Sequence, residues 1–158
     1  MKKLVLLLLT VALLLFAGCA AHFPPVGTET PDATEPESIT EMYITVNDHK
    51  LKITLADNSS VTALTELLKA GDITYTADDY GGFEKVGNIG HTLPKNDTQI
   101  TTEAGDVMLY LGNQICIFIG SNSWAYTPIG KINGYTVSEL RAILGAGEGA
   151  VEITIGLK

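Results

Sequence analysis

The sequence predicts a mainly β domain, built as a closed antiparallel barrel with two short helices at its openings. Six or more segments show either the two-residue alternation or the short apolar runs that are typical of strands. Only two segments show the apolar spacing of helices, which is too few to cover both faces of a parallel sheet. A closed antiparallel barrel accommodates all of these elements and leaves no strand edge exposed.

The first 18 residues have the pattern of a bacterial export signal and are set aside from the fold. Two lysines precede an almost entirely apolar run from Leu4 to Phe16, which is shorter than the roughly 20 residues of a membrane-spanning helix. Small residues then precede Cys19, in a pattern that resembles the lipobox of bacterial lipoproteins. We expect cleavage before Cys19 and lipid attachment to its sulfur, which would hold the protein at the extracytoplasmic face of the cell membrane. The alternative is an ordinary secretory signal with a chance cysteine near its cleavage site.

Residues 19–41 have the composition of a tether. The segment contains several prolines, threonines and acidic residues but no lysine or arginine. Apolar residues are too few to form a core, and proline and like charge favour an extended chain. We therefore expect a lipid-anchored, acidic, Pro/Thr-rich spacer that ends where a single folded domain, residues 42–158, begins.

The charge and cysteine content exclude several classes of protein. Removal of Lys2 and Lys3 with the signal changes the formal net charge from −8 to −10. Such an acidic domain has no basic stripe, so we expect no nucleic-acid partner, and the lipid anchor is its expected contact with the membrane. Cys116 is then the only other cysteine and lies in an apolar run, where we expect a small buried side chain. Without a disulfide, the domain must be stabilised by its core alone.

The elements follow in order along the domain. Alternating residues at 42–46 and 51–55, separated by Asn47-Asp48, predict a β-hairpin, and apolar spacing predicts a helix over 61–68. A short strand is expected at 73–76. Residues 77–105 are rich in Gly, Asp, Asn and Thr, which favours short strands joined by ordered loops.

The second half of the domain contains a second hairpin and a second helix. Two apolar runs, 107–111 and 114–119, flank Gly112-Asn113, which predicts a two-residue turn. Thr136 and Glu139 have the spacing of a capping box for a helix that ends near Leu144. Alternating residues from Val151 to Ile155 predict the last strand.

Several longer motifs in this domain resemble the bacterial and archaeal cyclophilin-like fold proteins. They are DYGGFEKVG at 79–87, LP at 93–94, GDVMLY at 105–110, GNQ at 112–114 and GSNSW at 120–124. The resemblance extends from about Met42 to Lys158. It implies a closed antiparallel barrel of about eight strands with two short capping helices.

The resemblance does not carry an isomerase site with it. True cyclophilins use an arginine to ease rotation about a prolyl bond, against a barrier of about 18–20 kcal/mol. The only arginine of this chain, Arg141, falls in the second predicted helix, and none lies between Asp72 and Gly90, where the corresponding strand would supply it. We therefore assign no catalytic residue.

Two segments contain candidate ligand-binding residues. The first segment is 80–84, where two glycines would let a ligand approach the backbone. Tyr80 and Phe83 offer contact surface there, and Glu84 offers a carboxylate. The alternative is a tight turn with Phe83 capping the core. In the second, small polar groups accompany aromatic residues at the end of a buried strand, as in many pockets. Its candidates are Asn122, Trp124 and Tyr126. The alternative there is a capped turn with Trp124 as a lid.

Three functions remain open from the sequence. The first is a non-catalytic module that binds a peptide or a small molecule at the barrel mouth. The second is an extracytoplasmic peptidyl-prolyl isomerase, or foldase, that works without the usual arginine. The third is an accessory to a larger surface assembly. The three histidines show no metal-ligand spacing, and hydrolase and nucleotide motifs do not occur, so we expect neither a metal nor a cofactor.

Overall fold

The computed structural model describes residues 41–158, so the predicted signal peptide, Cys19 and nearly all of the tether lie outside the described residues. Within 41–158 no helix is long and apolar enough to span a membrane. The described elements are, in order, β1 (Met42–Val46), β2 (His49–Leu55), α1 (Ser59–Leu68), β3 (Ile73–Tyr80), β4 (Glu84–Asn88), β5 (Thr98–Thr101), β6 (Asp106–Tyr110), β7 (Gln114–Phe118), β8 (Ser123–Ile132), α2 (Val137–Ile143) and β9 (Val151–Leu157).

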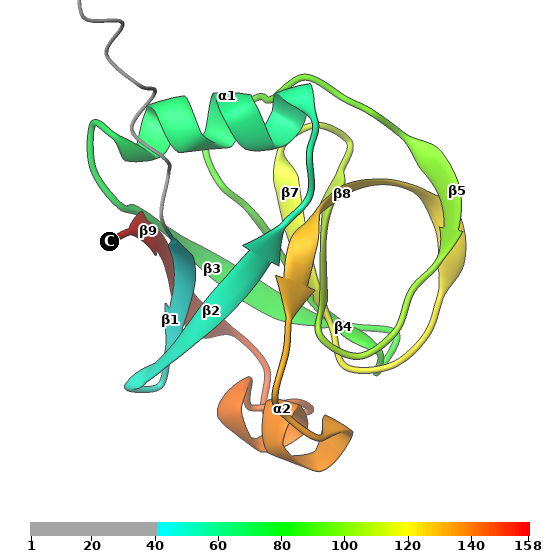
Figure 1. The fold of residues 1–158 in the computed structure, drawn as a ribbon. Coiled ribbons are helices and arrows are strands. Elements are labelled where there is room, and N and C mark those ends of the chain that lie inside the picture. Colours follow the sequence, from blue (N-terminus) through cyan, green and yellow to red (C-terminus); the bar gives the residue numbers. More distant parts are fainter. Residues whose placement is uncertain (1–40) are drawn as a thin grey trace, which may run out of the picture. The chain divides into compact units, whose positions relative to one another are not determined.

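Eight of the strands form a closed antiparallel barrel, as the sequence predicts. They are hydrogen-bonded in the order β2-β1-β9-β3-β4-β7-β6-β8, and a further pairing of β2 with β8 closes the circle. The remaining strand, β5, pairs only with the first part of β8 and stands away from the barrel (Figure 1). Helix α1 lies across one end of the barrel and α2 lies near the other (Figure 1).

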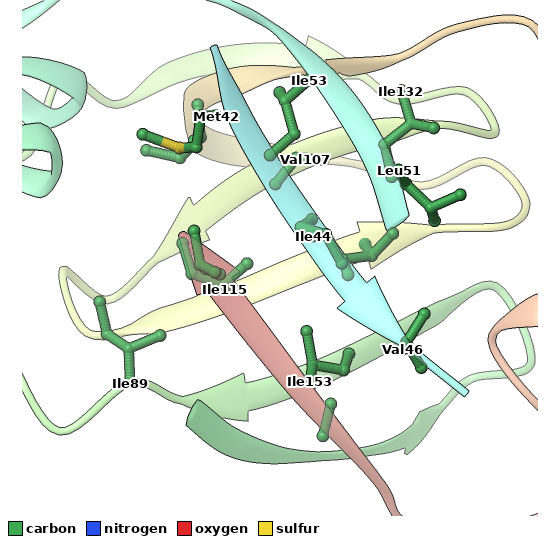
Figure 2. Packing of buried hydrophobic residues seen from close by; sticks show 14 of the residues in the cluster. Met42, Ile44, Val46, Leu51, Ile53, Ile89, Val107, Ile115, Ile132 and Ile153 are labelled. Atoms are coloured by element: carbon green, nitrogen blue, oxygen red, sulfur yellow. The ribbon is translucent and has the colours of Figure 1, made fainter. Parts of the chain in front are cut away.

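The main core fills the barrel. Alternate residues of β1 are fully buried, and their side chains meet those of the other strands in the interior (Figure 2). Helix α1 adds Val61, Leu64 and Leu68, which lie on one helical face, and α2 adds Leu140 and Ile143. The helix boundaries have local causes, because Asn58 caps α1 and Thr136 with Glu139 forms the predicted capping box of α2.

The two predicted hairpins form, with one difference. Asn47 and Asp48 have φ values of 46° and 65°, the left-handed conformation that this two-residue turn needs. The β6–β7 loop has three residues and not two, because Tyr110 pairs with Gln114. Leu111, which was predicted to end the strand, therefore lies in the loop with φ 52° and is 61% exposed.

Two strands differ from the sequence-based expectation because tertiary pairing decides them. Strand β3 continues past Thr76 to Tyr80, since β4 pairs with its polar end. Strand β8, which the residue pattern did not predict, is the longest strand described. Its start is exposed and lacks apolar alternation, and Pro128 lies where the pairing with β6 shifts register between Val107 and Met108.

Candidate functional site

The wall formed by β4, β7 and β6 is buried on both of its faces. Val107 and Ile117 lie opposite each other and belong to the main core inside the barrel. The next row, Val86, Cys116 and Met108, points outward by the alternation of strand side chains. On that outer face a second, smaller buried cluster forms from Met108, Cys116, Phe118 and Tyr126.

A pocket of about 270 Å³ opens beside this outer cluster. Its lining comes from the end of β3, from β4, from both ends of the β6–β7 hairpin loop and from the start of β8. The lining residues are Tyr80, Glu84, Val86, Tyr110, Gln114, Asn122, Trp124 and Tyr126. We call it the outer-wall pocket. The sequence analysis expected a binding site at the barrel mouth, whereas this pocket lies on the outside of the wall. The outward alternation of β4, β6 and β7 puts its lining residues on the side away from the barrel interior.

Five of the six residues proposed from the sequence line this pocket together, and Phe83 does not. Phe83 packs behind the lining, where its ring stacks on Phe118 at a centroid distance of 6.3 Å and meets the edge of Tyr80 at 6.0 Å. The alternative role of Phe83, packing against a core, therefore describes its contacts, although the core is the outer one.

Sequence reasoning missed three lining residues, Val86, Tyr110 and Gln114. Tyr110 and Gln114 are the pair that closes the β6–β7 hairpin. The Gly112-Asn113 turn signal predicted that hairpin from the sequence. Only the strand register shows that Tyr110 and Gln114 lie on the same outer face of the wall as Cys116 and Phe118. The nearly continuous apolar runs of these two strands indicate that both of their faces are covered, but they do not say which residues line a pocket there.

Glu84 is the chemically distinctive residue of the pocket. The residue is 4% exposed, and its Oε2 atom has no hydrogen-bond partner among residues 41–158. Burial raises the pKa of this carboxyl to about 7, opposed by a hydrogen bond with the Cys116 thiol. Burial likewise raises the pKa of the Cys116 thiol far above its usual range, and the side chain is fully buried, as predicted.

The neighbouring polar groups hold one another in place. The Asn122 Nδ2 atom donates to the Tyr126 hydroxyl at 2.9 Å, and the Asn122 backbone N–H donates to the Thr102 hydroxyl at 2.9 Å. Burial raises the pKa of Tyr126 to about 12, although the bond from Asn122 opposes it, so its phenol is neutral at physiological pH. Asn122 thus holds the Tyr126 hydroxyl in a pocket that also includes Trp124, which is 56% exposed.

Two cationic residues, Lys85 and Arg141, lie outside the pocket and bind other groups. Lys85 is fully buried, opposite Ile117 on the inner face, where its Nζ lies 3.0 Å from an Asp79 oxygen and donates to the Gly149 carbonyl. Arg141 reaches from α2 to the carbonyl of Gly82 at 3.2 Å and does not line the pocket. Among residues 41–158, no group of three His, Cys, Asp or Glu side chains could hold a metal ion.

Comparison with known proteins supports the resemblance seen in the sequence. A similar solved structure is the solution structure of the hypothetical protein AF2241 from Archaeoglobus fulgidus, with a TM-score of 0.54 and 18% identity over 75% of this chain and 94% of that chain. This likeness shows a shared fold. No curated protein matches the sequence significantly. The model of the Cyclophilin-like family matches residues 44–156, and the chain therefore belongs to that family.

Proposed function

We propose that this protein is a lipid-anchored, extracytoplasmic binding protein whose outer-wall pocket holds a small molecule or a peptide side chain without transforming it. The observation that supports this best is the convergence of four aromatic side chains and one unpaired carboxyl oxygen on a single pocket. Pockets of this kind, with apolar walls and a few polar groups, are typical ligand sites. Trp124 and Tyr80 remain 56% and 62% exposed, so a ligand would gain apolar contact on entering.

The alternative, prolyl isomerisation, has weaker support in the residues at the pocket. Acceleration requires groups that bind the twisted amide more strongly than the planar one. Within the described part of the chain no cation lines the pocket, and Arg141 already donates to the Gly82 carbonyl. The pocket can therefore hold an apolar or polar group, but no arginine among its lining residues could donate to a prolyl nitrogen as in cyclophilins.

Ligand binding can be followed through Trp124, because it is the only tryptophan of the chain. We expect members of a library of short peptides and small polar metabolites to shift its emission. In calorimetry Trp124→Ala should weaken the binding of any hit by more than about 1 kcal/mol, as for an aromatic contact anchor. Tyr135→Ala, an exposed aromatic outside the pocket, is the matched control. Equal loss in both variants, or no hit at all, would contradict the proposal.

A protease-coupled peptide assay separates the binding module from the isomerase. An uncatalysed prolyl bond isomerises in tens to hundreds of seconds, so modest catalysis by micromolar protein is visible above it. We expect no acceleration, with a known isomerase as the positive control. Acceleration that disappears in Phe83→Ala or Trp124→Ala would replace the binding proposal with the isomerase.

The membrane anchor depends on Cys19 alone, since Cys116 is buried in the domain. Metabolic labelling with a fatty-acid analogue should label the wild type and not Cys19→Ser, which should accumulate as unprocessed or released protein. Cys116→Ser serves as the control and should be labelled normally. Equal labelling of wild type and Cys19→Ser would exclude lipid attachment at this residue.

A further inference from the structure

We propose that the ligand of the outer-wall pocket carries an organic ammonium group, with Glu84 as its counter-ion and aromatic rings as its walls. This inference rests on the proposed binding function and specifies the chemistry of the ligand. It comes from three features of the pocket: an unpartnered acidic oxygen, the absence of a cation in the lining, and the number of aromatic side chains.

The first feature is a buried carboxyl group that no cation among residues 41–158 pairs. The Oε2 atom of Glu84 is buried without a hydrogen-bond partner, although buried carboxylates are normally paired. Lys85 follows it directly in the chain but points to the opposite face of the wall and is engaged by Asp79. A cationic ligand would supply the missing partner from outside.

The second feature is the charge around Glu84. From β3, Asp78 lies opposite Val86 at the exposed edge of the same outer face and adds a second negative charge. The other titratable groups that line the pocket are Tyr80 from β3, Tyr110 from β6 and Tyr126 from β8, and Cys116 from β7 lies on the same outer face of the wall. None of these is a cation, so the pocket attracts positive and repels negative ligands.

The third feature is the aromatic lining. Tyr80, Tyr110, Trp124 and Tyr126 contribute four rings to a pocket of about 270 Å³, which is the size of one small headgroup or side chain. Aromatic rings attract cations through the negative charge of their faces, and such cages recognise quaternary ammonium groups and alkylated amines. A neutral apolar ligand would use the same rings but leave the Glu84 oxygen buried and unpaired.

The pH dependence of binding follows from the state of Glu84. With a pKa near 7, the carboxyl is partly protonated at neutral pH and fully charged at pH 8.5. An ammonium ligand should therefore bind more tightly as pH rises through 7 and should release a proton when it binds. A neutral hydrogen-bond acceptor would behave in the opposite way, since it needs the protonated acid.

The test compares choline with its neutral carbon isostere, 3,3-dimethylbutan-1-ol. Calorimetry on the full chain in a non-ionic maltoside detergent keeps phosphocholine out of the sample. Choline does not titrate its ammonium, so any change of affinity with pH belongs to the protein. At pH 8.5 we expect choline to bind about tenfold more tightly than the isostere, or better, and to weaken several-fold at pH 6.

Glu84→Gln should remove both the preference for choline and its pH dependence, while Tyr135→Ala should leave them intact. A second pair, the N-acetyl methylamides of lysine and norleucine, identifies the source of the group. Tighter binding of the lysine derivative than of the norleucine derivative indicates that the ligand is a peptide side chain. If only choline binds more tightly than its neutral partner, the ligand is a quaternary ammonium group, on a lipid headgroup or on a free small molecule. If Glu84→Gln no longer unfolds cooperatively, Glu84→Asp replaces it; this variant shortens the side chain by one methylene and should weaken choline binding severalfold.

Equal binding of charged and neutral partners in both pairs would overturn the ammonium assignment. If peptides or other compounds from the library still bind in a Trp124-dependent manner, the binding function survives that result. If no compound of either kind perturbs Trp124, both the assignment and the proposed function fail.

Discussion

At the scale of single residues, Glu84 and Lys85 show how adjacent charged side chains can serve different purposes. Lys85 is buried against Asp79, whose other oxygen accepts backbone N–H groups from Gly147 and Gly149, so this pair is well supplied with partners. Glu84 has no comparable support. A buried acid left in this state destabilises the ligand-free protein, and such residues concentrate at functional sites.

The destabilisation that the buried Glu84 carboxylate causes when it is charged should be visible in the pH dependence of the free energy of unfolding. Its pKa is about 7 when folded against about 4.5 when unfolded, so the folded state binds more protons between these values. The free energy of unfolding should therefore fall by about 3 kcal/mol from pH 4.5 to pH 8 because of this residue. Urea unfolding should show the fall in wild type and a much flatter profile in Glu84→Gln. Glu66→Gln, on the exposed surface of α1, should retain the wild-type profile, and a flat profile in wild type would contradict the assignment.

At the scale of elements, the β3–β4 turn positions Phe83, which packs behind the residues that line the pocket. Gly81 and Gly82 both have left-handed φ values, 61° and 72°. A Cβ on Gly81 would lie 2.2 Å from the Phe83 ring, whereas one on Gly82 would meet nothing within 4 Å. The two positions therefore share backbone strain and differ only in packing.

The two glycines make a matched pair of substitutions. Gly82→Ala should cost about 1 kcal/mol from backbone strain alone. Gly81→Ala should cost about 1–3 kcal/mol more, because it displaces Phe83 from its stack on Phe118. It should also change the emission of Trp124, since the outer cluster supports the pocket. Equal stability of the two variants in denaturant unfolding would mean that the Phe83 ring moves without cost.

At the scale of the whole molecule, strands within residues 41–158 close the barrel, because β2 pairs with β8. The described contacts of the tether end belong to Glu41, whose carbonyl accepts the backbone N–H of Lys158 and whose carboxylate binds Lys52 and Tyr43. These contacts lie at the start of β1. A domain boundary just before Glu41 therefore retains every contact described.

We predict that residues 41–158 fold alone with nearly the stability of residues 19–158. Removing residues 19–40 takes away no apolar face, so the change in the free energy of unfolding should stay below about 0.5 kcal/mol. Chemical unfolding of both fragments, monitored by circular dichroism, measures this. Loss of the cooperative transition in the shorter fragment would show that the tether belongs to the fold.

The sequence by itself determined the local elements of this protein and its fold class. Alternation, the Asn47-Asp48 turn and the capping residues act over a few neighbours, so they predicted β1, β2, both helices and β9 correctly. The family motifs predicted the eight-stranded barrel, and the aromatic and polar clusters at 80–84 and 122–126 supplied five of the eight pocket residues.

Only the tertiary structure decided which face of each strand packs in the barrel core and which face lines the outer-wall pocket. A strand alternates between two faces, and the sequence does not say which neighbour covers each of them. The polar end of β3 and the exposed start of β8 become strands through long-range pairing with β4, β6 and β5. That pairing places Tyr110, Gln114 and Val86 beside Glu84 on the outside of the barrel, because residues distant in sequence become neighbours only when the register of the closed sheet is set.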